Sequence, residues 1–185
     1  MLAVYGLRPR ELFINPNIDW WLSEQNADIT WKVDKDCKTG EREALPLHRE
    51  WIAEFDLRNP KYSQMLLDAV NKKDISNHGQ ITGLTQRVSW WFRKIGLDFK
   101  PYDLRHAWAI RAHVLGVPIK AAADNLGHSV QVHTQTYQRW FSLDMRKLAI
   151  NNALSKKSEV EIIKEENQRL KLEVEKLRIE KVYSN

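Results

Sequence analysis

The sequence contains little sulfur and has no long apolar segment. Cys37 is the single cysteine among 185 residues, which excludes an intramolecular disulfide framework. No apolar run is long enough to span a bilayer or to serve as a signal peptide. These absences favour a protein of the reducing cytoplasm.

The composition is that of a folded chain with a basic surplus. Hydrophobic residues make up 43% and charged residues 29% of the sequence, which excludes a disordered chain and allows one substantial core with an appendage. The formal net charge is +5 and the pI is about 9.3. A surplus of this sign favours a polyanionic partner such as nucleic acid, through phosphate neutralisation and counterion release.

Two periodicities divide the first part of the chain. Residues 28–33 and 43–47 alternate polar with apolar side chains, so we expect a short antiparallel hairpin that turns at Gly40. From His48 onward, apolar residues recur at helical spacing in three stripes. These stripes are Trp51, Ile52 and Phe55; Met65, Leu66 and Val70; and Val88, Trp91, Phe92 and Ile95. Further helices are expected over 103–115, 118–126 and 132–140. The fold class predicted is mainly α with a small antiparallel β-sheet.

The tail lacks proline and glycine from residue 143 to residue 182, which favours one long helix. A heptad register places Val160, Asn167, Val174 and Lys181 at a, and Ile163, Leu170 and Leu177 at d. The g residues are all acidic (Glu166, Glu173, Glu180) and the e residues are all basic (Lys164, Lys171, Arg178). This pattern favours a parallel homodimer through residues 160–182. The alternative is a solvated amphipathic helix that packs on its own domain.

Four short motifs occur in a fixed order along the chain. They are GLRPREL at 6–12, KTG at 38–40, YDLRH at 102–106, and LGH at 126–128 followed by Tyr137 nine residues after the histidine. Together they resemble the signature of the tyrosine recombinases, the phage-integrase family. The resemblance implies a tyrosine recombinase catalytic domain over 1–145 that is incomplete at its N-terminus, a helical connector over 146–159, and a coiled-coil tail over 160–182.

The resemblance also implies a role for each residue of the candidate site. Arg8 and Arg105 would clamp the nonbridging phosphate oxygens, because a guanidinium stays charged and its planar fork suits phosphate. His128 would add a hydrogen bond, and Tyr137 would attack as the nucleophile to form a 3′-phosphotyrosyl ester. Lys38, on the hairpin turn, would protonate the departing 5′-oxygen. This chemistry needs neither ATP nor a metal, so no cofactor is expected.

One position departs from the family pattern. Tyr102 stands where the family usually has histidine, three residues before the second arginine, and a phenol is a poor base near neutral pH. We therefore expect Tyr102 to orient the phosphate. His106 is expected to face away from the site. The remaining histidines, His48, His78, His113 and His133, form no cluster with metal-ligand spacing and are interpreted as structural.

The leading hypothesis is a site-specific DNA recombinase or integrase that acts on double-stranded DNA as a homo-oligomer. It would be encoded by a bacterium or phage and act on a mobile element at the nucleoid. The alternative is a truncated, noncatalytic DNA-binding remnant or regulator, because the first arginine stands at residue 8. A dimerising adaptor would not need the five candidate residues together, which are Arg8, Lys38, Arg105, His128 and Tyr137. A type IB topoisomerase would need neither the coiled-coil tail nor the LGH motif.

Overall fold

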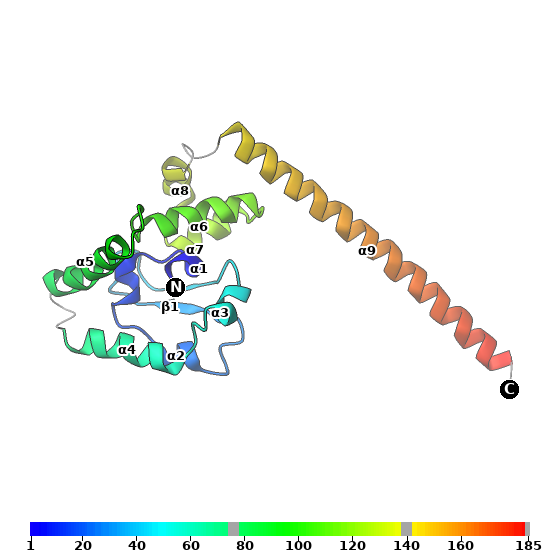
Figure 1. The fold of residues 1–185 in the computed structure, drawn as a ribbon. Helices are drawn as coiled ribbons and strands as arrows, with labels where there is room; N and C mark the ends of the chain where they lie inside the picture. The colour runs from blue at the N-terminus through cyan, green and yellow to red at the C-terminus, as the bar shows by residue number, and fades with distance from the viewer. Residues whose placement is uncertain (74–77, 138–141, 184–185) are drawn as a thin grey trace. The chain divides into compact units, whose positions relative to one another are not determined.

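The computed structural model describes residues 1–73, 78–137 and 142–183 (Figure 1). They form a mainly helical protein with one two-stranded antiparallel sheet, which confirms the predicted class. The chain divides into two units, Met1–His113 with Val117–Phe141, and Val114–Gly116 with Ser142–Asn185. The elements of the first unit are α1 (Leu2–Tyr5), the 3-10 helix η1 (Pro9–Leu12), α2 (Ile18–Leu22), β1 (Trp31–Val33), β2 (Arg42–Ala44), α3 (Glu50–Glu54), α4 (Pro60–Asn71), α5 (His78–Lys94), α6 (Asp103–Val114), α7 (Ile119–Leu126) and α8 (Val130–Tyr137).

Aromatic side chains from three N-terminal segments form the centre of the main core. Trp21 of α2 packs edge-to-face on Tyr5 of α1 and on Trp31 of β1, with ring centroids 5.8 and 5.7 Å apart. All three rings are buried. Edge-to-face packing is a preferred geometry for aromatic pairs and adds to the free energy of burying their large apolar surface. This packing holds α1 in place, and with it the GLRPREL motif that follows α1 directly.

The hairpin is present but shorter than the alternation predicted. β1 pairs with β2 so that Trp31 lies opposite Ala44 and Val33 opposite Arg42. Asn26 accounts for the late start of β1, because its side chain accepts a hydrogen bond from the amide of Thr30 (2.8 Å) and donates one to the Thr30 carbonyl (2.9 Å). These bonds close a turn in place of strand pairing. The turn between the strands contains Gly40, at φ 70°.

The helices after the hairpin follow the predicted spacing, but each of the three predicted stripes is only partly covered. Phe55 of the first stripe and Met65 of the second are 55% and 60% exposed. Ile81 and Leu84 of α5 are buried, and α5 packs on η1. Trp91 and Ile95, which belong to the predicted stripe, are instead 48% and 63% exposed. The C-terminal end of α5 therefore extends beyond the core, and Lys94 lies 4.7 Å from the centroid of the Trp91 ring.

The three helices of the second half agree closely with the sequence. α6 and α7 have nearly the expected bounds, and α8 begins two residues earlier than predicted. Residues 138–140 of the last predicted helix lie outside the described part of the chain. Trp108 of α6 is buried and donates from Nε1 to the Val4 carbonyl (2.9 Å), so α6 is tied to α1 across more than a hundred residues of sequence.

The second unit consists mainly of α9 (Leu143–Tyr183), a single long helix, as the tail composition predicted (Figure 1). Val114, the last residue of α6, belongs to this unit, and its carbonyl accepts a hydrogen bond from Asn152 Nδ2 (3.1 Å). Ile163, Leu170 and Val174 on α9 are each at least half exposed. Asn167, at a, is also exposed and donates from Nδ2 to the Ile163 carbonyl (2.9 Å). The side chains of Val160, Leu177 and Lys181 are not among those that the structure describes. Among the described helices, none is both long enough and apolar enough to cross a membrane.

Candidate functional site

A buried carboxylate joins the first three motifs. Glu11 of η1 is 2% exposed and accepts hydrogen bonds from Arg8 Nη1 to Oε1 (2.9 Å) and from Arg42 Nη2 to Oε2 (2.8 Å). Its Oε1 also accepts from the Thr39 hydroxyl (2.9 Å), and Arg105 Nη1 lies 3.7 Å from Oε2. One carboxylate therefore contacts three guanidiniums, two of which belong to the predicted site.

Glu11 is ionised at all ordinary pH values. Burial alone would raise its pKa, but the hydrogen bond and charge of Arg42, the Arg8 amide and the charge of Arg105 outweigh burial and lower the pKa to about 2. A permanent negative charge in this position balances part of the positive charge of the cluster. The sequence motif includes Glu11, but sequence reasoning gave it no role.

Arg105 is held by backbone carbonyls of the other motifs. Its side chain is fully buried on α6 and donates from Nη1 to the Gly6 carbonyl (2.7 Å) and from Nη2 to the Leu126 carbonyl (2.5 Å). Burial, and the like charge of Arg8, lower its pKa. The second arginine therefore links residues 6 and 126, which are far apart in sequence.

Close packing at two glycines keeps these motifs together. A Cβ on Gly6 would stand 2.6 Å from Leu126 Cδ2 and 2.9 Å from the Trp108 ring. A Cβ on Gly127 would stand 2.7 Å from Thr39 Cβ. Both glycines have φ 67°, a left-handed conformation that side chains disfavour. Glycine is therefore required at both points for the end of α1 and the hairpin turn to pack against the end of α7.

Tyr137 ends α8 and is surrounded by histidines. It is 1% exposed, and its ring centroid lies 6.1 Å from that of His128, 4.8 Å from that of His133 and 5.6 Å from that of His106. Burial raises the pKa of Tyr137, and the nearby Arg105 charge opposes that rise. The expectation that His106 faces elsewhere is wrong: α6 brings the His106 ring between Tyr102 and Tyr137. The position of His106 could not be read from spacing alone, whereas the four-residue interval from His133 to Tyr137 within a predicted helix could have indicated their contact.

The other two predicted residues lie at the edge of this cluster. Tyr102 is 40% exposed, with its ring centroid 5.0 Å from that of His106. Lys38 is exposed on the hairpin turn. Two residues near Lys38 connect the turn to the cluster. The Thr39 hydroxyl donates a hydrogen bond to Glu11, and Arg42 donates from Nε to the Asn125 carbonyl (2.9 Å). Arg105 and Tyr137 thus form the buried part of the candidate site, Arg8 and His128 are partly buried, and Lys38 and Tyr102 form the exposed part.

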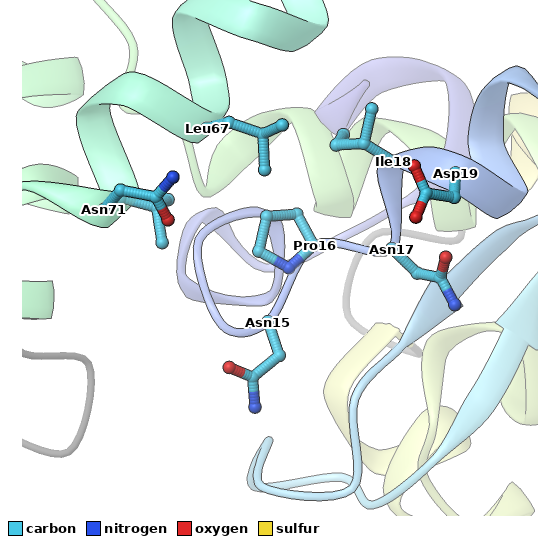
Figure 2. Close-up of a pocket in the computed structure, with 8 residues that line it drawn as sticks. Asn15, Pro16, Asn17, Ile18, Asp19, Leu67 and Asn71 are labelled. Atoms are coloured by element: carbon cyan, nitrogen blue, oxygen red, sulfur yellow. The ribbon is translucent and has the colours of Figure 1, made fainter.

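A cavity of the first unit lies outside this cluster. Figure 2 shows it between the segment from Asn15 to Asp19 and the α4 residues Leu67, Val70 and Asn71, with a volume of about 430 Å³. Its lining offers amides, apolar groups and one carboxylate, and none of the predicted site residues. In the part of the chain that the structure describes, no group of three His, Cys, Asp or Glu side chains could hold a metal ion.

Comparisons with known proteins give two curated relatives. The chain is 79% identical over 170 residues to Excisase A of Nostoc sp. (strain PCC 7120), an alignment that covers 92% of this chain and 36% of the relative. It is 55% identical over 185 residues to Excisase C of the same organism, covering 96% of this chain and 37% of the relative. The chain thus spans little more than a third of the length of the curated relatives it matches. No family model matches the chain, and no solved structure does.

Proposed function

We propose that this chain carries out strand breakage and rejoining during excision of a mobile DNA element, through a 3′-phosphotyrosyl bond at Tyr137. The excisase names of the two relatives support the setting, since they denote excision. The observation that carries the chemistry is the meeting of Arg8 and Arg105 at the Glu11 carboxylate, which places two guanidiniums in one cluster. Burial raises the pKa of the Tyr137 phenol, and the charge of Arg105 opposes that rise. In this proposal, the chain acts on double-stranded DNA in the cytoplasm of its host.

Each residue of the site then has a task in phosphoryl transfer. Arg8, whose side chain is 23% exposed, and Arg105 stabilise the charge that develops on the nonbridging oxygens. His128 donates a third hydrogen bond to the phosphate, and Tyr102 helps to orient it. The Tyr137 oxygen bonds to phosphorus as the bond to the 5′-oxygen breaks, and Lys38 protonates that oxygen. The reverse attack by a 5′-hydroxyl rejoins the strands.

The second candidate is a noncatalytic DNA-binding regulator of such an element. The burial of Tyr137 favours it, because a nucleophile that is 1% exposed cannot reach a phosphate without movement of α8. The carbonyl partners of Arg105 favour it as well, since they occupy donors that the phosphate would need. In the enzyme proposal, DNA binding must therefore expose Tyr137 and redirect Arg105.

Covalent trapping distinguishes the two candidates. The chain is incubated with nicked suicide duplexes made from the junctions of mobile elements, and the products are separated on denaturing gels. We expect an adduct with the wild type and none with Tyr137→Phe. Tyr62→Phe is the matched control, because Tyr62 is a 52% exposed tyrosine on α4, and it should form adduct at the wild-type rate. Duplex binding without an adduct would favour the regulator.

The proposal includes a parallel homodimer through residues 160–182. Three side chains at the a and d positions of α9 are at least half exposed and therefore available to a second helix. They are those of Ile163, Leu170 and Val174. In a parallel pair, Glu166 faces Lys171 of the second copy and Glu173 faces Arg178, whereas an antiparallel pair opposes like charges. A second copy of this chain in parallel orientation is therefore the partner that the charge pattern fits.

A further inference from the structure

His133 lies against the proposed nucleophile, one helical turn before it. His133 and Tyr137 are four residues apart on α8, so the helix places their side chains on the same face. The His133 side chain is 2% exposed, and its ring centroid lies 4.8 Å from that of Tyr137 at an interplanar angle of 54°. The two rings are therefore in contact inside the protein.

A ring nitrogen of His133 has an unused hydrogen-bonding capacity. Among the described residues, its Nδ1 is buried and has no hydrogen-bond partner, and the same holds for Nδ1 of His128, whose ring centroid is 5.2 Å away. Leaving such an atom unpaired in the interior destabilises the folded protein. Two unpaired imidazole nitrogens next to a buried phenol indicate a site that receives a proton or a ligand.

Burial and the positive charges around His133 keep its imidazole neutral, and they also make it a weaker base than a free imidazole. α6 presents Arg105, His106 and His113 on this side, and the loop after α7 presents His128. Burial first, then the charges of Arg105 and His113, lower the pKa of His133. Burial and Arg105 likewise lower the pKa of His128, to about 4. The titratable residues Lys120 and Asp124 of α7 pair with each other at the surface.

We propose that His133 accepts the phenolic proton of Tyr137 as the phosphotyrosyl bond forms. This rests on the proposed function, and it supplies the base that Tyr102, a phenol, does not provide. As the Tyr137 oxygen bonds to phosphorus, its proton passes to the imidazole of His133, and the bond from phosphorus to the 5′-oxygen breaks. The departing oxygen takes a proton from Lys38. On rejoining, His133 returns its proton to Tyr137.

The test measures the rate of adduct formation as a function of pH for the wild type, His133→Asn and His133→Gln. At pH 7, we expect the rate to fall about 100-fold in both variants, the loss typical of removing a general base. Duplex affinity should stay within about twofold. The rate of the variants should recover as the pH rises toward the phenol's own ionisation. His48→Asn is the control, because His48 stacks on Trp51 outside the site, and it should keep the wild-type profile.

A 5′-bridging phosphorothiolate duplex separates the base from the acid. A thiolate leaves without a proton, so Lys38→Ala should regain its rate on this substrate while His133→Asn stays slow. Equal rates and pH profiles for wild type and both His133 variants would overturn the role of His133 and leave the proposed function standing. Absence of adduct in the wild type on any duplex would overturn both. Circular dichroism melts of the variants show whether a rate loss reflects unfolding.

Discussion

Glu11 shows how one residue controls the charge balance of the site. It contacts Arg8, Arg42 and Arg105, and its side chain is 3% exposed. Removing one partner of a buried ionic group costs more than the group contributes when it is intact, because the remaining charges stay in the interior without compensation. The three guanidiniums would then repel each other where little water reaches to screen them.

Glu11→Gln should therefore lower the free energy of unfolding by about 3 kcal/mol at pH 7. Urea denaturation followed by tryptophan fluorescence measures this loss. Asp124→Asn is the matched control, since Asp124 pairs with Lys120 at the surface with side chains 58% and 71% exposed, and its effect should stay below about 0.5 kcal/mol. If the two substitutions have equal effects, Glu11 does not organise the cluster.

The pH dependence of stability follows from two depressed pKa values. The pKa of Glu11 falls from 4.5 to about 2, so its contribution is present above about pH 4.5 and is lost as the pH falls toward 2. The pKa of His128 falls from 6.5 to about 4, because burial disfavours the imidazolium. The folded state therefore favours uncharged His128, and the free energy of unfolding decreases as the pH falls from about 6.5 toward 4.

When the pH falls from 7 to 5, the free energy of unfolding should decrease less in His128→Asn and His128→Phe than in the wild type, by about 1 kcal/mol. This value is discounted for solvent screening, because His128 is only partly buried. Denaturation curves at the two pH values measure the difference. If the wild type and both variants lose the same unfolding free energy, a group other than His128 titrates in this pH range.

At the scale of elements, two glycines test how closely the motifs must approach. Gly6→Ala would place a Cβ 2.6 Å from Leu126 in a left-handed conformation, so we expect a loss of about 2 kcal/mol in unfolding free energy. Gly83→Ala, within α5, meets nothing within 4 Å and should stabilise the protein by about 0.5–1 kcal/mol, because alanine has the higher helix propensity. In thermal melts, the melting temperature should fall for Gly6→Ala and rise for Gly83→Ala. A loss of stability in both variants would indicate a more general sensitivity to substitution.

The hairpin and the helices illustrate what local pattern can predict. Alternation located the hairpin, and apolar spacing with glycine and proline breaks located α6 and α7 almost to the residue. β1 came out shorter because the side chain of Asn26 forms local hydrogen bonds with Thr30 that close a turn in place of strand pairing. The α2 helix was not predicted, since its five residues are too few to show a period.

At the scale of the whole molecule, α9 gives the clearest prediction. Deleting residues 160–185 should convert a dimer into a monomer, because it removes the whole register of a and d residues. Light scattering measures the change. Ile163→Lys should have the same effect by placing a charge at d, whereas Arg169→Ala, outside the a, d, e and g positions, should leave the dimer intact. A monomer before and after the deletion would disprove the zipper.

The sequence by itself determined the element types, the order of the motifs and the residue types that phosphoryl transfer needs, because spacing and chemistry are local properties. Only the tertiary structure decided which of those residues meet. It brought Arg105 to the carbonyls of Gly6 and Leu126, and made Glu11 the common partner of three arginines. It also brought His106 of α6 against Tyr137 of α8. Contacts between distant segments depend on how the elements pack, and no single stretch of sequence records that packing.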